Sequence, residues 1–394
     1  MAGGSTATPQ RPTATAIAPT ATPIVSPCAA NAGAAAEAWA NFTQNPQVLG
    51  SINGGPDATL SNFIYPLGLP NESNDHLSAI AWAPDAKHLA VVVTVFQAME
   101  QVYYPYIVDT TTHVVTRVTL PQATSLSAPN EWNPWRLLAW ADNSTLLIFA
   151  AGSSGGSEKT VSYRYDLNSG TVSPLLGVTS AAEGVVHSSL LFYLDLTPVT
   201  QLGSNSAWSK GSALLHRYDL NNNTEIGAPV RLGDTWSGAG YEGGIDFPGW
   251  DVSPDGAQIA YQQTSASLDN NQQLVTTSNF LASNADGSNA VQILTGAIAT
   301  SPAFLAISPD GRLVAVTNAM PTPTVLSGSI SGGPAHFYQP DAGGPPIWLG
   351  STLFEADLNP GSGGGIERWA VNSGGGRAQG CIAHQNSGNP ATLP

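Results

Sequence analysis

The sequence has few charged residues, and basic residues are the scarcer kind. Asp, Glu, Lys and Arg make up 10% of the 394 residues, and 12 basic side chains stand against 27 acidic ones, for a net charge of −15. A surface that binds nucleic acid needs clustered Lys and Arg to neutralise phosphates. The composition therefore excludes nucleic acid as an expected partner.

Long apolar runs are also missing. No window of about 18 apolar residues occurs, so we expect no membrane span in this chain. A secretory leader would show a cationic start and an apolar stretch, whereas Met1 is followed by Ala, Gly, Ser and Thr. We nevertheless expect an extracellular or cell-surface protein that has lost its leader, on the strength of its two cysteines.

Catalytic and metal-binding motifs are sparse. The seven His residues show no HExxH or H-x-H spacing, and with two Cys in the chain we expect no metal site. Residues 152–156 match the nucleophile pattern G-x-S-x-G but lack the strand-to-helix elbow that exposes the serine. We therefore predict no catalytic residue, no cofactor and no enzyme activity.

The sequence does contain an internal repeat. In GWDVSPDGAQIAY, residues 249–261, an apolar strand leads through a tight turn into a second apolar strand. Pro254 sets φ at the first corner, Asp255 bonds the nearby backbone, and Gly256 takes the positive φ. The pattern returns, in some places faintly, at residues 80–92, 138–149, 304–316 and 347–356. A repeat of this kind decides the fold before other features do.

The repeats predict the blades of a propeller. In the first blade, the inner, second, third and outer strands are expected at residues 78–83, 88–95, 103–109 and 114–120. A third-strand pattern with its own turn occurs six times, at residues 106–113, 163–170, 216–223, 280–289, 336–344 and 368–376. Short strands with regular turns are typical of propellers. We predict an all-β fold: a six-bladed β-propeller of four-stranded antiparallel blades over residues 62–394, preceded by an extended Pro/Thr-rich N-terminal segment.

The first part of the chain is expected to lie outside the propeller. Residues 1–28 are rich in Pro and Thr and cannot bury enough apolar area to order themselves, which favours a stalk or linker. Alternatively, residues 1–27 are an arm that adds to a neighbouring subunit's sheet edge. Residues 29–61 are predicted as a connecting segment, with a possible short helix at residues 34–42. Residues 63–69 resemble an outer strand, and docking them on the last blade would close the ring by pairing its two ends.

These motifs carry a family resemblance. The Ser-Pro-Asp-Gly turns and the third strands ending in Tyr-Asp-Leu-Asn-Ser-Gly, as at residues 165–170, resemble those of TolB-type β-propellers and their WD-repeat-like relatives. The resemblance covers residues 62–384. The family includes periplasmic binding proteins, partners of peptidases and surface proteins, so it implies the fold and leaves the function open.

One face of the propeller is expected to carry the site. Connections from second to third strands, and from blade to blade, share a face that we call the long-loop face, and loops on a rigid scaffold often bind ligands. Its candidate ligand-binding residues are Trp132, Trp135, Trp208, Trp236, Tyr241 and Glu242. Aromatic rings beside carboxylates suit a glycan or a protein partner. The alternative is that these rings only pack the loops onto the blades.

The two cysteines flank the repeat array. Cys28 ends the Pro/Thr-rich segment, and Cys381 follows the last third strand. A ring whose ends meet in one blade would bring both together, so we predict a disulfide that fastens the ring in an oxidising compartment. Two unrelated thiols are the alternative.

Taken together, the sequence predicts an extracellular, non-catalytic propeller that acts as a binding or assembly module on a stalk. A carbohydrate-active enzyme that uses the long-loop face is one alternative. A subunit of a surface fibre or filament, joined through residues 1–27, is another. Two carboxylates and a base gathered over the central channel would favour the enzyme.

Overall fold

The computed structural model describes most of the chain from Ala36 onward. The described residues are 36–41, 47–52, 58–62, 76–97, 100–121, 136–154, 157–175, 177–178, 181–202, 207–238, 249–295, 297, 303–318, 324–338, 344–357, 365–371, 381–384 and 387–393. Their regular structure is entirely β. Within these ranges there is accordingly no helix of the length and apolarity that a membrane span requires.

The strands are short and numerous. The first half of the chain contributes β1 (Ala36–Asn41), β2 (Gln47–Ile52), β3 (Ala58–Asn62), β4 (His76–Trp82), β5 (His88–Gln97), β6 (Glu100–Asp109), β7 (Val115–Arg117), β8 (Leu138–Trp140), β9 (Thr145–Ser154), β10 (Ser157–Asp166), β11 (Thr171–Pro174), β12 (Ala181–His187), β13 (Leu190–Leu196) and β14 (Thr200–Gln201). The second half contributes β15 (Trp208–Asp219), β16 (Thr224–Glu225), β17 (Val230–Gly238), β18 (Trp250–Val252), β19 (Gln258–Leu268), β20 (Leu274–Asn284), β21 (Val291–Gln292), β22 (Ala303–Ile307), β23 (Leu313–Asn318), β24 (Thr324–Ser329), β25 (His336–Phe337), β26 (Ile347–Trp348), β27 (Leu353–Asp357), β28 (Ile366–Ala370), β29 (Cys381–His384) and β30 (Ser387–Leu393).

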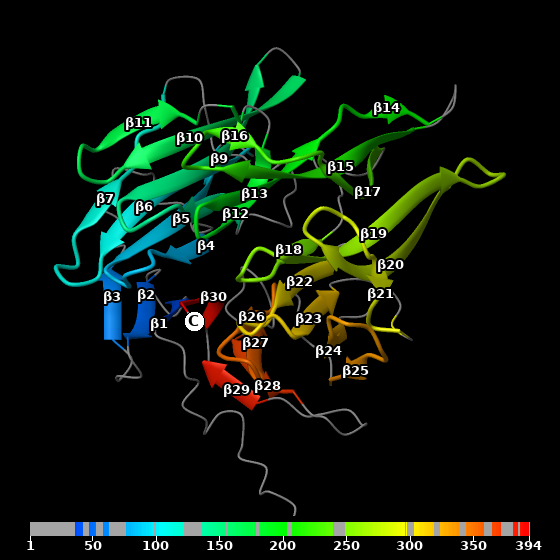
Figure 1. Ribbon diagram of the computed structural model, residues 1–394. Coiled ribbons are helices and arrows are strands. Elements are labelled where there is room, and N and C mark those ends of the chain that lie inside the picture. Colours follow the sequence, from blue (N-terminus) through cyan, green and yellow to red (C-terminus); the bar gives the residue numbers. More distant parts are fainter. Residues whose placement is uncertain are drawn as a thin grey trace, which may run out of the picture.

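These strands form antiparallel sheets around a ring (Figure 1). Six sheets of the described chain are four-stranded: β4 to β7, β8 to β11, β18 to β21, β22 to β25, β26 to β29, and β1 to β3 with β30. One further sheet holds the six strands β12 to β17. Each sheet contacts the next through strands near the centre, such as β4 with β8, β18 with β22, and β30 with both β27 and β4.

The predicted all-β propeller of four-stranded antiparallel blades is confirmed. The six sequence repeats form the sheets from β4 to β29, and the β12 to β17 sheet is the one that gains additional strands. The ring also contains the sheet of β1 to β3 with β30, one more than the repeats predicted. Residues 29–61, expected to be a connecting segment, contribute strands to that sheet, and Ala36–Asn41, considered as a helix, is its strand β1. Pairing on both sides by β2 and β30 overrides the helix propensity of an Ala-rich stretch.

The ring is closed by strands from opposite ends of the described chain. Ala36 of β1 lies opposite Leu393 of β30, and Asn41 lies opposite Ser387. Closure by pairing of the two ends was expected, and it occurs with different strands from those proposed. Residues 63–69, the proposed closing strand, lie outside the described residues.

The Ser-Pro-Asp-Gly turns are built as the sequence predicts. Ser253 Oγ donates to Asp255 Oδ1 at 2.6 Å, and the Gly256 N–H donates to the Ser253 carbonyl at 2.7 Å. Gly256 has a φ of 69°, in the left-handed region that favours glycine. The turn at Ser308 repeats this geometry, with Gly311 at a φ of 70°. These residues are therefore structural.

One detail of the last repeats differs from prediction. The third strand of the β22 to β25 sheet is β24, and residues 336–344, expected to supply it, contain the outer strand β25. The faint repeat at residues 347–356 forms the first two strands of the next sheet, β26 and β27. Residues 336–344 contain the Tyr, Asp and Gly that mark third strands elsewhere in the chain, whereas β24 is followed by no such turn motif. The prediction therefore assigned the third strand one strand too late.

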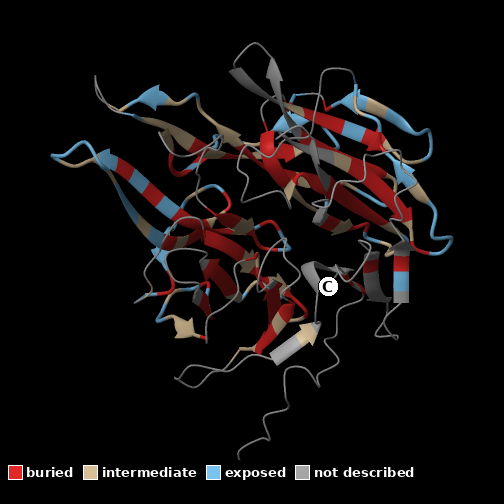
Figure 2. Ribbon diagram, turned by 180° about the vertical axis from the view of Figure 1, so that it is seen from behind, coloured by how far each residue is buried: buried red, intermediate tan, exposed pale blue. Residues whose placement is uncertain are grey.

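Neighbouring sheets are joined by apolar packing and by indole hydrogen bonds. The Trp140 Nε1–H donates to the Ala81 carbonyl of the preceding sheet at 3.0 Å, and the Trp348 Nε1–H donates to the Ala306 carbonyl at 2.9 Å. Buried residues concentrate in the inner strands, and exposed ones at the outer strands and hairpin tips (Figure 2). The core therefore lies between the sheets, as in other propellers.

Several connections of the long-loop face are strand extensions. In the hairpin of β19 and β20, pairing runs from Gln258 opposite Asn284 out to Leu268 opposite Leu274. Most of residues 264–276, which connect the second strand of this blade to the third on the long-loop face, are thus β-structure that projects from the ring (Figure 1). In the hairpin of β9 and β10, Ser154 lies opposite Ser157, and residues 152–154 of the G-x-S-x-G match belong to strand β9.

Candidate functional site

Polar side chains gather at the centre of the ring, near the long-loop face. We call Arg136, Glu183, His187, Trp250 and Asp251 the channel cluster. Glu183 and His187 lie on β12, Trp250 and Asp251 begin β18, and Arg136 directly precedes β8. These inner strands begin where the connections between blades arrive, so all but His187, at the far end of β12, lie toward the long-loop face. The cluster combines two carboxyl groups, a guanidinium and an imidazole.

Arg136 reaches across the ring. Its Nη2 lies 2.9 Å from Asp251 Oδ1 and 3.5 Å from the Leu305 carbonyl of β22. The β18 and β22 sheets are neighbours, but the β12 to β17 sheet separates the β8 sheet from them, so the contacts of Arg136 span the central channel. The guanidinium carbon also sits 4.4 Å from the centroid of the Trp250 ring, a cation–π contact. The side chain is thus held in one orientation.

Asp251 is fixed from two sides. Its Oδ1 pairs with Arg136, and its Oδ2 accepts the Ile307 N–H at 2.7 Å. The side chains of the ion pair are 18% and 15% exposed, so solvent screens the pair only in part. These contacts join the sheets that begin with β8, β18 and β22.

Glu183 is the buried acid of the cluster, with 2% of its surface exposed. The Trp250 indole N–H donates to its Oε1, while its Oε2 has no partner among the described residues. Burial raises the pKa of Glu183 to about 7; Arg136 and the indole hydrogen bond lower it, and the charge of Asp251 adds to the rise. Near neutral pH this group exchanges a proton readily.

His187 completes the cluster as a neutral imidazole. Burial lowers its pKa, outweighing the nearby charge of Asp251, so the uncharged ring prevails at neutral pH. Its Nε2 is buried without a partner among the described residues. The cluster thus contains one fixed ion pair and two groups that are uncharged or partly charged.

The cluster has uncommitted hydrogen-bonding capacity. Arg136 uses only Nη2 in hydrogen bonds within the described residues, which leaves Nε and Nη1 as donors. Glu183 Oε2 adds a group that accepts when ionised and donates when protonated. Donors beside a carboxyl group match the hydroxyls of a polar ligand. Where the structure describes the chain, no group of three or more metal-ligating side chains occurs.

Most of the residues predicted for the long-loop face cannot be compared with the structure. Trp132, Trp135, Tyr241 and Glu242 lie outside the described residues, and their ligand-binding role stays a prediction. So does the Cys28–Cys381 disulfide, because Cys28 also lies outside them; no disulfide occurs among the described residues.

Trp208 and Trp236 lie on the extended strands β15 and β17. Trp208 is half-buried opposite Gly238, and Trp236 is 3% exposed opposite Lys210. A side chain as buried as Trp236 packs between strands in this conformation, which fits the alternative that the rings hold the long-loop face onto the blades. We therefore do not build the proposed site on it.

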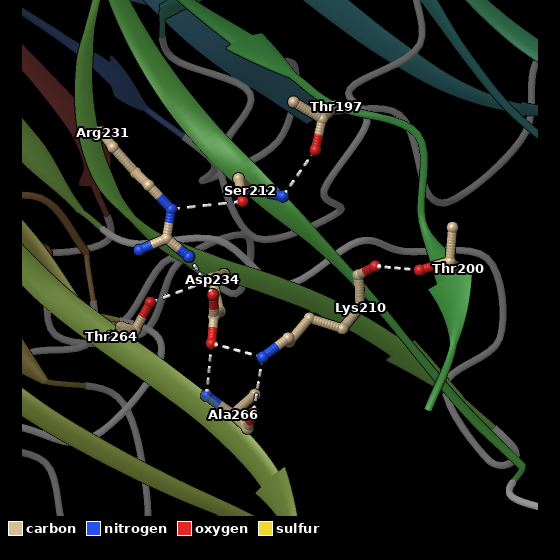
Figure 3. A network of polar contacts seen from close by, with 8 residues as sticks. All are labelled: Thr197, Thr200, Lys210, Ser212, Arg231, Asp234, Thr264 and Ala266. Atoms are coloured by element: carbon tan, nitrogen blue, oxygen red, sulfur yellow. Dashed lines mark hydrogen bonds and ion pairs between the residues drawn. The ribbon is translucent and has the colours of Figure 1, made fainter. Parts of the chain in front are cut away.

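A second polar network is centred on Asp234 and involves the strands β15, β17 and β19 (Figure 3). Asp234, which is 4% exposed, accepts from Lys210 Nζ at 3.1 Å and from the Ala266 N–H at 2.8 Å, and it pairs with Arg231. Burial opposes its ionisation, but these donors outweigh burial, and the pKa of Asp234 is lowered. Because its carboxylate is fully engaged, this network joins β15 and β17 to β19 and offers no site.

Sequence reasoning missed the channel cluster, although one signal was present. When the repeats are aligned on their turns, Asp251 stands where the others have Ala81, Ala139 and Ala306. A carboxylate at an inner-strand position where the other repeats have alanine indicates that this residue has a polar role and does not only pack. Arg136 and Glu183 carry no such signal, because their partners come from other blades.

Comparison with known proteins shows the fold. No protein-family model matches the chain, and no curated protein matches it. TolB from Acinetobacter baumannii is similar at 14% identity and a TM-score of 0.45, over 91% of this chain and 67% of that one. An oligogalacturonate lyase in complex with manganese is similar at 12% identity and a TM-score of 0.50, over 88% and 84%. A prolyl endopeptidase is similar at 10% identity and a TM-score of 0.49, over 93% of this chain and 52% of that one. The predicted resemblance to TolB-type propellers is confirmed as a likeness of fold.

The same comparison corrects one prediction. The absence of familiar catalytic motifs led us to predict that the chain is not an enzyme. That prediction is wrong, because enzymes occur among proteins of this fold. An oligogalacturonate lyase is among the proteins with similar structures. One fold hosts many functions, so the function must be argued from the site.

Proposed function

We propose that the channel cluster binds a neutral carbohydrate at the long-loop end of the central channel. The observation that carries the proposal is the state of Arg136: Trp250 and Asp251 hold its guanidinium in place, while Nε and Nη1 have no hydrogen-bond partner among the described residues. Side chains that are fixed before binding lose little entropy when the ligand arrives.

The charge of the cluster favours a neutral ligand. Arg136 is already paired with Asp251, and a protonated Glu183 adds no charge. The chain as a whole carries a net charge of −15, which repels anions. Sugar hydroxyls can accept hydrogen bonds from Arg136, whose side chain is 18% exposed, while the buried Trp250 ring holds the guanidinium from one face.

A second candidate function is acid–base cleavage of that carbohydrate. Glu183 and Asp251 are carboxyl groups in different environments, one buried with a pKa of about 7 and the other held by Arg136. Glycoside cleavage commonly uses two carboxyl groups, one protonated and acting as the acid and the other ionised. Glu183 would act as the acid. This arrangement is the one that the sequence analysis named as favouring an enzyme.

An extracellular or cell-surface location belongs to the proposal. A module that binds carbohydrate has its ligands there, and the predicted Cys28–Cys381 disulfide would form in that compartment. Mass spectrometry of the thiols, described in the Discussion, tests this part separately.

A titration of neutral oligosaccharides by calorimetry tests the proposal. Arg136→Gln should weaken binding by about tenfold or more, because it removes the donors and the cation–π contact. Arg231→Gln is the matched control, since Arg231 also pairs with an aspartate but lies outside the channel. Equal affinity of Arg136→Gln and the parent, or no binding by the parent at millimolar ligand, would overturn the proposal.

Glu183→Gln separates binding from cleavage. Gln keeps an acceptor for the Trp250 indole but cannot donate a catalytic proton. If the parent cleaves the bound oligosaccharide, Glu183→Gln should bind it and release no product. A parent that binds and never cleaves supports the first function and excludes the second.

A further inference from the structure

The hairpin of β19 and β20 ends in an unprotected sheet edge. β21 pairs with β20 at Leu281 and Ala282, and the Ile293 N–H donates to the Phe280 carbonyl at 2.9 Å. Beyond that point, from Leu274 to Asn279, no described strand pairs with the outer side of β20. We call Leu274 to Asn279 the β20 edge.

The register of the hairpin tells which main-chain groups face outward. The Asp269 N–H donates to the Gln273 carbonyl, so alternate residues from Val275 onward bond to β19. Leu274, Thr276 and Ser278 therefore direct their N–H and C=O groups away from β19. Phe280, the next in this alternation, already uses its carbonyl in this way. The β20 edge thus offers a regular ladder of donors and acceptors.

The β20 edge lacks the usual protections. Natural edge strands carry charges, prolines or bulges that prevent pairing with another chain. No charged residue or proline occurs between Asp269 and Asp286, and the pairing of β19 with β20 shows no bulge. Val275 is 43% exposed, and Thr276 and Thr277 are also exposed. The edge is six residues long, uncharged, free of bulges and rich in β-branched residues.

The sequence before β1 contains a segment that matches this edge. Residues 13–18, TATAIA, lie between Pro12 and Pro19 and contain neither proline nor charge. They are as long as the β20 edge and place Thr and Ile at alternate positions, so β-branched side chains would share one face of an added strand. Such side chains stabilise cross-strand pairs with Val275 and Thr277. The flanking prolines would end the pairing on both sides.

The position of β1 favours a second copy as the donor of this segment. Along the ring, two sheets separate the sheet of β1 from the sheet that contains β20, and the hairpin projects away from it (Figure 1). To pair within one molecule, the residues between Ala18 and Ala36 would have to span the ring, at a cost in chain entropy. We propose that residues 13–18 of one molecule add as a strand to the β20 edge of a second copy, and so link the chain into assemblies.

Sedimentation velocity with complementary variants tests the proposal. Deletion of residues 1–27 removes the donor, and Thr276→Pro blocks the edge by removing an outward N–H. Each variant alone should be monomeric at concentrations where the parent associates. Mixed together, they should form a 1:1 complex, because one supplies the segment and the other supplies the edge.

Two controls keep the outcomes decisive. Thr276→Val leaves the backbone intact and should associate as the parent does. If Thr276→Pro fails to fold, a fluorescent peptide of residues 11–20 should bind the deletion variant, and Thr15→Pro in the peptide should weaken this binding by at least about tenfold. A monomeric parent, a deletion variant that associates like the parent, or a peptide that does not bind would overturn the proposal. Failure here leaves the channel cluster untouched.

Discussion

The Trp250 indole donates its hydrogen bond to the carboxyl group of Glu183, on the inner strand of the neighbouring sheet. Trp250 thus has two contacts at once, since its ring face also receives the guanidinium of Arg136. One aromatic side chain therefore orients two of the four polar residues of the channel cluster, Glu183 and Arg136. Their positions are set by packing in the absence of any ligand.

Glu183→Gln should change how stability depends on pH. The pKa of Glu183 rises from its ordinary value of 4.5 to about 7. Between these values the unfolded chain loses this proton while the folded chain keeps it, so rising pH destabilises the parent. Gln removes this effect, and the variant should gain on the order of 2–3 kcal/mol relative to the parent between about pH 4 and about pH 8.

Urea unfolding at both pH values measures this difference. Asp286→Asn is a suitable control, because Asp286 sits in an exposed turn and its pKa is lowered, which places its titration below this window. If the stabilities of Glu183→Gln and the parent stay parallel across the window, Glu183 is not the buried titrating group.

Asp234→Asn should show the opposite dependence. The hydrogen bond from Ala266 and the charges of Lys210 and Arg231 outweigh burial and lower the pKa of Asp234 from 3.8. Its contribution to stability is therefore present above this value and lost as pH falls through the lowered pKa. Near pH 7 the substitution should cost about 2–4 kcal/mol, since it leaves two cations without their partner. The cost should shrink in unfolding experiments below about pH 3. A cost that is unchanged in acid would show that the network depends on shape alone.

Two glycine substitutions should differ in severity for different reasons. A Cβ on Gly249 would lie 1.9 Å from the Ala303 carbonyl of the next sheet, so Gly249→Ala must push two sheets apart and should cost about 3 kcal/mol or more. Gly170 has a φ of 67°, and a Cβ added there would meet no atom within 4 Å, so Gly170→Ala should cost only about 1 kcal/mol of backbone strain. Thermal unfolding of both variants measures the contrast. Equal costs would contradict the steric argument at Gly249.

The Cys28–Cys381 disulfide can be tested by intact-mass measurement. The unfolded chain is treated with an alkylating agent with and without reductant. A disulfide predicts two added groups only after reduction, and breaking it should destabilise the ring by roughly 3–5 kcal/mol. Two alkylated thiols without reductant would remove both the disulfide and the argument for an oxidising compartment.

The fold could be predicted where the sequence is locally repetitive. The turns at Asp255 and Asp310 are recognisable from the four-residue sequence Ser-Pro-Asp-Gly. The strands that flank them are predicted by short apolar stretches on either side of these turns. The sheet of β1 to β3 with β30 carries no such turn. Its β30 is polar and contains Pro390, and its β1 is rich in alanine. β1 is paired by β2 on one side and by β30 on the other, and the pairing of Ala36 with Leu393 is so distant along the chain that it leaves no local trace in the sequence.

The site was harder to predict for the same reason. Sequence analysis chose aromatic residues of the long loops by composition, whereas the channel cluster arises from side chains that approach across the ring. Nothing in the sequence around Arg136 distinguishes it from other arginines, and its role is visible only from its contacts with Asp251 and Trp250 in the structure. Asp251 was read as part of a turn-forming repeat, and only its alignment with alanines distinguishes it.

The pairing of β1 with β30 also bears on the rate of folding. The other sheets form from strands that follow one another closely, so their contacts are made within short loops. β1 and β30 must find each other after almost the whole chain has been synthesised and ordered, and such distant contacts slow a folding reaction. We expect the other sheets to form quickly as an open arc and the pairing of β1 with β30 to close the ring slowly. During that delay the unpaired edges of β1 and β30 are exposed, so this is where a strand from another chain can pair most easily.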